Sequence, residues 1–288
     1  MNDFWAALST HPFLQRALAA AMLASVASGV VGSYVVARRI TAIAGGISHC
    51  LLGGMGVARY LQVTRGWDWL QPLHGAVVAA IVAAVIIGVV SIRWNEREDT
   101  VISALWAVGM AVGVLFISRT PGYGQDLMSY LFGNILMVSS KDLWLVAGLD
   151  AVVIALAVAF HEQLLGVCFD DEFARIRGVR AEGYYLLLLG LTALTVVLLV
   201  TVVGLVMVIA LLSLPAAIGM QLGRSLRQVM VVATALSAAF TISGLVLSYG
   251  ADLPAGATSI VIAGMCYLVV LAGVGLVRRL RKSRTPAA

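Results

Sequence analysis

The sequence predicts an all-α protein, a polytopic transmembrane bundle of about nine membrane segments that forms one domain over residues 1–288. Hydrophobic residues make up 61% of the chain and charged residues only 11%, whereas a soluble domain is about a quarter charged because polar groups must cover its surface. The apolar runs are long enough for helices rather than for the strands of a membrane barrel. These features exclude a soluble enzyme, a nucleic-acid-binding protein and a disordered chain, and they make the lipid bilayer the surroundings of the fold.

Apolar runs between polar breaks define the spans, each of about the 20 residues that a membrane helix needs. The run 185–221 holds two spans, and we divide it near Gly204 because a single span would put the polar loop 161–184 on the wrong side of the membrane. The stretch 127–139 is short for a span, so we expect it to be partly embedded or to lie at the interface. The predicted spans are 14–37, 42–63, 73–93, 100–118, 143–160, 185–203, 205–221, 229–249 and 258–277.

The distribution of basic residues predicts the orientation, because cytoplasmic loops carry an excess of lysine and arginine. The tail RRLRKSR (278–284) is strongly basic, so we place the C-terminus in the cytoplasm; most of the 19 basic residues then fall on the inner side. Trp67 and Trp69 fall at the outer end of a helical hairpin, where interfacial tryptophans are common. The 3 cysteines are far apart, which predicts neither a disulfide framework nor a CxxC metal site.

Two cytoplasmic segments are predicted to be ordered. The segment FDDEFARIRGVR (169–180) opens with acidic residues and continues with arginines, as expected for a short helix whose dipole is complemented. The segment LPAAIGMQLGRSLRQ (214–228) has Pro215 where we expect a helix to start, and Arg224 and Arg227 at the membrane surface. Both segments are equally compatible with plain connectors that lie on the membrane surface.

The segment AIAGGISHCLLGGMGVA (42–58) contains the main candidate site. A histidine in the middle of a membrane is costly unless it is paired or lines a wet cavity. Residues four apart share a helix face, so His49 lies between small residues and its imidazole is open to something outside its own helix. The two neighbouring stripes of this helix are Gly45, His49 and Gly53, and Gly46, Cys50 and Gly54.

Two readings of this segment stay open. In the first, the glycines form a helix-packing surface and His49 bonds a neighbouring helix. In the second, His49 is a metal ligand on a translocation path, since neutral imidazole is the usual nitrogen donor for zinc and similar ions. Cys50 would add a soft ligand, but it points about 100° away around the helix, which favours a packing role.

Two acidic residues are further candidate ligands. Asp150 lies in the middle of an apolar span, where an acid is a functional hypothesis by default, satisfied either by a serine, an arginine or water, or by a metal. Asp126 lies near the outer side, where its oxygens would meet an incoming cation; the alternative is an ordinary capping or turn role.

The chain lacks the motifs of a catalytic protein. It has no GxxxxGK[ST] loop, so any use of ATP requires a separate subunit. It also has no HExxH or GxSxG motif. The sequence therefore predicts a transport subunit and not an enzyme.

Five segments together resemble the membrane permease subunit of bacterial ABC importers for zinc, manganese and iron. They occur in the order of that family and extend over nearly the whole chain. The segments are GSYVVARRITAIAGGISHCLLGGMGVA (32–58), SYLFGNIL (129–136), CFDDEFARIRGV (168–179), VVGLVMVIALLSLPAA (202–217) and LSYGADLPAGATSIV (247–261).

The resemblance implies a homodimer in the bacterial cytoplasmic (inner) membrane, related in architecture to the vitamin B12 and siderophore importers. It implies cytoplasmic ATP-binding subunits, an extracytoplasmic metal-binding protein that delivers the ion, and no permanently bound cofactor besides the transported metal. In that family picture, 214–228 couples the ATPase to the membrane path and 168–180 lies close by. The coupling residues are then Pro215, Arg224, Arg227, Asp171 and Glu172.

One departure from the family pattern bears on the cargo. Many members carry an aspartate four residues before the histidine, as in GDALSH, whereas this chain reads AGGISH, with Gly45 in that place. Without that carboxylate the site is poorer in oxygen ligands, which favours zinc over manganese or iron. We also expect two His49 residues to meet across the dimer axis, with water or Asp150 completing the ligand set.

Three rival interpretations remain. The same fold would import manganese, iron or a metal chelate. A proton- or sodium-coupled carrier that works alone would need paired acids at the midplane and broken helices in matching halves, and Asp150 is the only acid in mid-span. A structural scaffold would require both His49 and Asp150 to be silent. Unlike the last two, a permease subunit co-purifies with an ATPase, and its transport requires ATP.

Overall fold

The structure, a computed structural model, describes residues 7–8, 10–94, 98–121, 138–251 and 253–282. Within these ranges the chain is helical, without strands, and contains nine helices long and apolar enough to span a membrane. The predicted all-α fold with nine spans is confirmed. The nine helices are α2 (Pro12–Arg38), α3 (Thr41–Arg65), α4 (Pro72–Arg93), α5 (Glu98–Arg119), α7 (Ser140–Ala159), α10 (Ala181–Val203), α11 (Leu205–Leu222), α12 (Leu226–Ala251) and α13 (Ala255–Lys282).

Two shorter helices, α8 (His161–Phe169) and α9 (Asp171–Ile176), connect α7 to α10. The short helix predicted within 169–180 is confirmed as α9. The carboxylate of Asp170 accepts a hydrogen bond from the backbone N–H of Phe173 and so caps the first turn, as aspartate commonly does. Two further acids follow in that turn, where they complement the positive end of the helix dipole.

The break near Gly204 is also confirmed. Gly204 has φ 83° and ψ 163°, a conformation that is essentially restricted to glycine because a Cβ would clash there. The chain therefore leaves α10 and enters α11 within a single residue. The run 185–221 thus forms two antiparallel spans with almost no loop between them.

The prediction that Pro215 starts a helix is wrong. Pro215 lies in the interior of α11, ten residues after Leu205, and it is buried. Because proline lacks an N–H, it leaves the carbonyl of Leu211 without its usual helical donor. Membrane helices tolerate this loss because neighbouring helices and side chains satisfy the backbone group. The true helix start is set by Gly204, and the segment 214–228 is the end of α11, a short turn and the first residues of α12.

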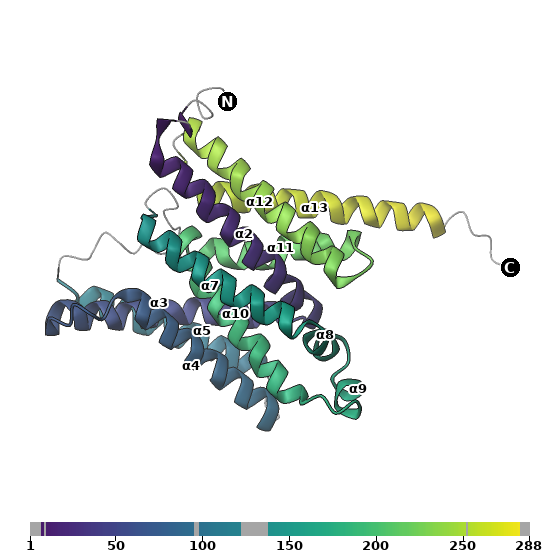
Figure 1. The fold of residues 1–288 in the computed structure, drawn as a ribbon, viewed down its shortest axis with the longest axis horizontal. Helices are drawn as coiled ribbons and strands as arrows, with labels where there is room; N and C mark the ends of the chain where they lie inside the picture. The colour runs from purple at the N-terminus through teal and green to yellow at the C-terminus, as the bar shows by residue number, and fades with distance from the viewer. Residues whose placement is uncertain (1–6, 9, 95–97, 122–137, 252, 283–288) are drawn as a thin grey trace.

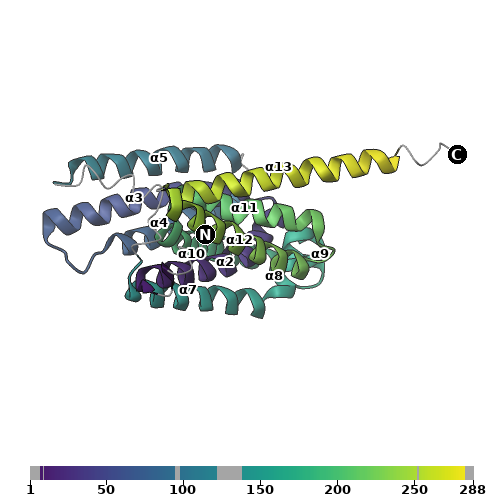
Figure 2. The ribbon, with the colours of Figure 1, turned by 90° about the horizontal axis from the view of Figure 1, so that it is seen from above.

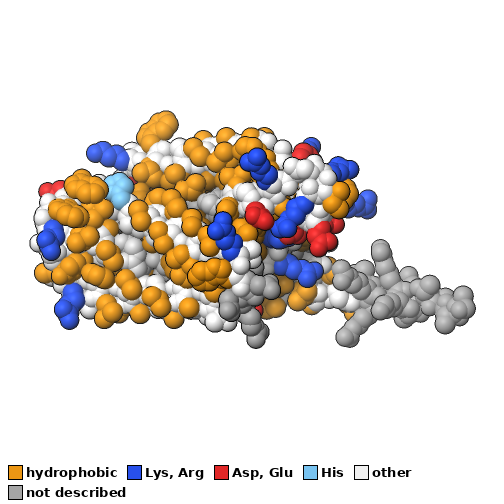
Figure 3. All heavy atoms as spheres, turned by 90° about the horizontal axis from the view of Figure 1, so that it is seen from below, with side chains coloured by type: hydrophobic (Ala, Val, Ile, Leu, Met, Phe, Trp, Pro, Cys, Tyr) orange, Lys and Arg blue, Asp and Glu red, His pale blue; other side chains and the backbone are white. Residues whose placement is uncertain are grey.

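The helices pack around α2 and α10, which lie in the middle of the bundle and are buried along much of their length (Figure 1). α7 lies along one side of the bundle, whereas α5 and α13 lie along the opposite side (Figure 2). The helix α3 is held between α4 and α5. Hydrophobic side chains cover the middle of the face in Figure 3, and charged side chains of both signs gather towards the end where α8 and α9 lie. This pattern fits a membrane-embedded apolar belt with a polar end outside the hydrocarbon.

Glycines bring the backbones of α3 and α5 into direct contact. A Cβ at Gly53 would lie 2.8 Å from the carbonyl oxygen of Gly109, and a Cβ at Gly109 would lie 2.7 Å from the Cα of Cys50. On its other face, α3 meets α4 in the same way, through Gly54 and Gly75. Close backbone approach through small residues is typical of membrane helices, and here it fixes α3 from two sides.

We expect Gly53→Ala to destabilise the folded protein by about 1–3 kcal/mol, because its methyl group meets a backbone carbonyl that cannot move without separating α3 from α5. Thermal unfolding in detergent micelles measures this change. Gly148→Ala on α7 is the matched control, since no atom lies within 4 Å of its Cβ position, and it leaves the melting temperature unchanged or slightly raised. Equal melting temperatures for the two variants would contradict the close packing.

Candidate functional site

The imidazole of His49, in the first half of α3, stacks on the indole of Trp106 from α5. The ring centroids are 4.2 Å apart and the planes differ by 12°. His49 is half-buried, and its Nδ1 is buried without a hydrogen-bond partner among the described residues. A buried polar nitrogen without a partner is uncommon in native structures, so this atom needs a ligand or a role.

Gly45, one turn before His49, leaves room beside the stacked rings. A Cβ at this position would lie 3.8 Å from the indole of Trp106 and 3.6 Å from the side chain of Ile209 on α11. A larger side chain would press on both groups. Both distances are ordinary van der Waals contacts, so a methyl group would fit beside the stacked rings and only a longer side chain would disturb them.

The other glycines and the cysteine of this segment lie in contacts between helices. Gly46 packs against Ile102 of α5, and Gly53 and Gly54 form the backbone contacts described above. The thiol of Cys50 is directed to the backbone carbonyl of Leu105, with 3.2 Å between sulfur and oxygen. This geometry gives Cys50 a packing partner on α5. The contacts of Cys50 and of the three glycines are thus contacts between helices, and their roles as metal ligand or path lining stay predictions.

Asp150 and His49 are not brought together within one chain. Asp150 is only 3% exposed, and its Oδ1 has no hydrogen-bond partner in the described part of the chain. Its helix α7 packs against α2 and α10, on the opposite side of the bundle from α5 (Figure 2). Among the described residues, no group of three or more His, Cys, Asp or Glu side chains could hold a metal ion. Asp126 and most of the predicted embedded stretch 127–139 lie outside the described residues.

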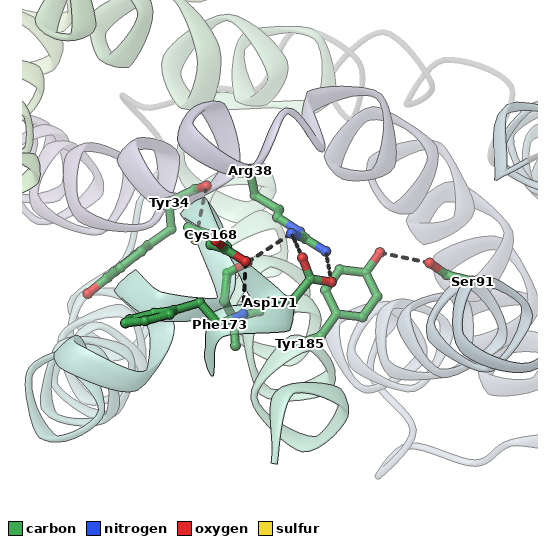
Figure 4. Close-up of polar contacts among 9 residues, drawn as sticks. Tyr34, Arg38, Ser91, Cys168, Asp171, Phe173 and Tyr185 are labelled. Carbon is green, nitrogen blue, oxygen red and sulfur yellow. Dashed lines mark hydrogen bonds and ion pairs between the residues drawn. The ribbon is translucent and has the colours of Figure 1, made fainter. Parts of the chain in front are cut away.

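At the end of the bundle where α8 and α9 lie, Arg38 joins α2 to α9. Its two terminal nitrogens donate to both carboxylate oxygens of Asp171 at 3.0 and 3.1 Å, and one of them also donates to the backbone carbonyl of Val167 at 2.9 Å (Figure 4). The guanidinium lies over the ring of Tyr185, 5.6 Å from its centroid. This hydrogen-bonded ion pair lowers the pKa of Asp171, so the carboxylate is charged at neutral pH. Burial raises the pKa of the neighbouring Cys168 to about 12, which keeps it a thiol.

One turn earlier, Tyr34 joins α2 to α8. Its hydroxyl lies 2.6 Å from Nδ1 of His161, and Arg227 donates from Nε to the Nε2 of the same ring at 3.3 Å. Since Nε2 accepts, the neutral ring carries its proton on Nδ1 and donates it to the Tyr34 oxygen. Arg227 also pairs with Glu162 at 2.9 Å. The end of α2 therefore contacts the segment 168–180 directly through Arg38 and reaches Arg227 of the segment 214–228 through His161.

Sequence reasoning missed Tyr34, Arg38 and His161 as parts of this network. The available signal is the spacing of four residues between Tyr34 and Arg38, which places them on one face at the end of a span. Their partners are more than 120 positions away along the chain, so no local pattern identifies them.

The remaining coupling candidates are on the surface. Glu172 and Arg224 are exposed. Beside them a groove of about 680 Å³ runs between α8, α9 and the start of α12, with Phe169, Phe173 and Leu226 among its lining residues. Large apolar side chains at this polar end stay exposed, Ile176 to 83%. Exposed apolar groups among charges outside the membrane belt are typical of a surface that binds another protein.

The chain belongs to the ABC 3 transport family, whose family model matches residues 10–273. It is 38% identical over 276 residues to a protein of Chlamydia muridarum described as a "Probable metal transport system membrane protein", with 96% of this chain and 92% of that protein covered. It is 32% identical to the manganese transport system membrane protein MntC of Listeria monocytogenes, over 92% of each chain.

Two solved structures share the fold. PsaBC from Streptococcus pneumoniae in complex with Fab superposes with a TM-score of 0.83 and 29% identity, over 93% of this chain and 94% of that chain. An inward-facing transporter of the metal-chelate ABC type superposes with a TM-score of 0.70, over 93% and 88% of the two chains. At 14% identity, the second likeness shows the fold alone.

We expect Asp171→Asn to loosen α9 from α2. Because its pKa is lowered from 3.8, Asp171 contributes this stability above its unfolded-state pKa and loses it only as the pH falls through the lower folded-state pKa. At pH 7 the wild-type pair is complete, so removal of the charge speeds amide hydrogen exchange in 171–176 by roughly two- to fivefold, as expected for a partly exposed pair.

Glu182→Gln is the matched control for this measurement. Its contact with Arg175 is 3.9 Å long and both side chains are more than half exposed, so we expect no measurable change in exchange. Equal exchange in the two variants would remove Arg38–Asp171 as the link between α2 and α9.

Proposed function

We propose that the chain is the permease subunit of an ATP-driven importer of divalent transition metals and that the ion passes His49. The observation that carries this proposal is an imidazole in mid-membrane whose buried Nδ1 has no hydrogen-bond partner among the described residues. Membership of an ABC transport family and relatives named for metal and manganese transport support it. Imidazole nitrogen is a good ligand for zinc and iron, so the site fits a transition-metal cargo.

Zinc remains the first candidate on chemical grounds, and manganese is the alternative. The surroundings of His49 in this chain supply a glycine, an indole and a backbone-bonded thiol in place of a carboxylate. Manganese prefers oxygen ligands, whereas zinc accepts nitrogen readily. The names of the relatives favour manganese, so element-specific uptake must decide between the two.

We expect His49→Ala to lower metal uptake at least tenfold, because it removes the only mid-span imidazole of the described chain. The measurement is ATP-driven uptake of radioactive zinc and, separately, of radioactive manganese into cells that lack the native gene. Cys50→Ala is the control, since its thiol faces the Leu105 carbonyl, and it keeps at least half of the uptake.

The outcomes of this experiment separate the interpretations. Zinc uptake that depends on His49 supports zinc as the cargo. If only manganese uptake depends on His49, the importer stands and its cargo is manganese. Unchanged uptake of both metals in His49→Ala removes His49 from the path.

A second copy of the chain is part of the proposal. A single chain offers one imidazole and no group of three ligands in its described residues, whereas transition metals bind with several protein ligands. Two His49 residues that face each other across a homodimer axis supply a pair. The proposed dimer lies in the bacterial inner membrane, with each C-terminus on the cytoplasmic side. An extracytoplasmic metal-binding protein delivers the ion, and no resident cofactor is needed.

Separate ATP-binding subunits dock on the cytoplasmic end of the proposed dimer. The groove beside α8 and α9, the exposed apolar side chains and the surrounding arginines supply a surface of the expected kind. Arg227 connects this surface to the membrane span α2 through His161 and Tyr34. A displacement of the start of α12 would therefore move α8 and α2 with it, in a single two-state rearrangement.

We expect Arg227→Gln to uncouple transport from ATP hydrolysis. Uptake and metal-stimulated ATPase activity fall severalfold, while equilibrium binding of zinc stays within about twofold, because Arg227 is an exposed residue at the start of α12 and belongs to neither helix of the His49–Trp106 pair. The protein should co-purify with its ATPase, and uptake should stop without ATP.

Arg119→Gln, at the opposite end of a span, is the charge-matched control and leaves the ATPase activity unchanged. Full metal-stimulated ATPase activity in Arg227→Gln would remove this contact from the coupling route.

A further inference from the structure

We infer that Trp106 is the positioning residue of the proposed metal site: its indole fixes the plane of the His49 imidazole and leaves the nitrogen-bearing edge of the ring free for the ion. The inference rests on the proposed function, since it assigns a role to Trp106 in the site that contains His49. It also makes Trp106 the spectroscopic reporter of that site.

The stacking geometry protects the face of the imidazole and not its edge. With the ring centroids 4.2 Å apart and the planes 12° from parallel, the indole covers one face of the imidazole. Both ring nitrogens bind metals in the plane of the ring. The indole therefore restricts rotation of the imidazole without occupying a position that a metal ion would take.

The usual orienting device of a ligating histidine is missing here. Such a residue almost always donates its second ring N–H to a carboxylate, a carbonyl or water, which fixes the tautomer and the ring orientation. The Nδ1 of His49 is buried without a hydrogen bond to any described residue. The torsion that turns the ring is otherwise broad, so the Trp106 indole is the group that sets its orientation.

The backbone contacts of α5 keep the indole in place. One turn before Trp106, Ile102 packs on Gly46, and one turn after it Gly109 touches the backbone of α3. Trp106 thus lies between two fixed points of the same helix pair. Gly45 leaves the adjoining space open, since a Cβ there would already lie 3.8 Å from the indole.

Trp106 also lies at the surface of the single chain. It is 40% exposed although it belongs to the middle of a span. One part of the indole therefore packs on His49 while the rest faces away from this chain. In the proposed dimer that position borders the path, where an aromatic face also attracts cations.

Zinc binding to the full-length chain, purified with its ATP-binding subunit in lipid nanodiscs, tests this role. We expect Trp106→Leu, which keeps apolar volume but loses the stack, to weaken the zinc Kd by roughly 10- to 100-fold, as loss of an orienting partner does. Trp106→Phe retains a stacking ring and stays within about threefold of wild type. Trp144→Leu is the control, since Trp144 is 80% exposed on α7 and has no place beside His49.

Fluorescence tests whether the ion binds beside Trp106, and the conservative variant Trp106→Phe separates an aromatic stack from apolar packing in the zinc Kd. A cobalt ion on His49 lies within a few ångströms of the indole and quenches its emission. We expect saturable quenching by Co²⁺ that is lost in Trp106→Phe, although the metal still binds, and that is also lost in His49→Ala.

The outcomes distinguish the metal site at His49 from the positioning role of Trp106. If His49→Ala leaves the zinc Kd unchanged, the proposed site itself is wrong. If His49→Ala abolishes binding while Trp106→Leu matches wild type, the metal site stands and the role of Trp106 is wrong. Quenching that persists in Trp106→Phe would contradict an ion bound beside Trp106, because another of the 6 tryptophans would then be the reporter.

Discussion

The direct backbone contact between α3 and its two neighbours is the constraint on which the rest of the structure depends. Glycines at 53 and 109 leave no space for a methyl group between α3 and α5, and Gly54 with Gly75 does the same towards α4. In a membrane, apolar side chains gain nothing from leaving lipid, so close packing of small residues becomes the main source of helix association. That packing sets the height at which His49 and Trp106 face each other, and the stacked pair follows from it.

The end of the bundle that contains α8 and α9 is held together by charge-assisted hydrogen bonds instead. Arg38 and Tyr34 extend from the end of α2 to α9 and α8, and Arg227 adds the start of α12. Directly after Arg38, Arg39 adopts a left-handed conformation (φ 64°) and turns the chain towards α3. The helix that carries His49 therefore follows the Arg38–Tyr34 network after one tight turn. The proposed metal site on α3 and the proposed coupling network at the end of α2 thus belong to consecutive helices.

Much of the fold could be predicted from the sequence, because lipid demands long apolar helices and glycine is nearly alone in adopting the conformation of Gly204. The nine spans, the break and the short helix α9 follow from local composition. The sequence placed Pro215 at a helix start because proline favours the first turn of helices in soluble proteins. A membrane helix also tolerates proline in its interior, where Pro215 lies. The stacking of Trp106 on His49 and the pair Arg38–Asp171 could not be predicted, since each joins residues more than 50 positions apart, and only the three-dimensional packing sets them face to face.

The direct backbone contact of α3 with α4 and α5 also limits how the bundle can change shape. Helices that touch through their backbones cannot approach further, and they cannot separate without opening a void that lipid or water must fill. The low-energy displacement left to α3 is a slide along its own axis at constant distance, the shear type of motion rather than a hinge. Such a slide would carry the His49 imidazole along the membrane normal while α3 keeps its spacing from α4 and α5.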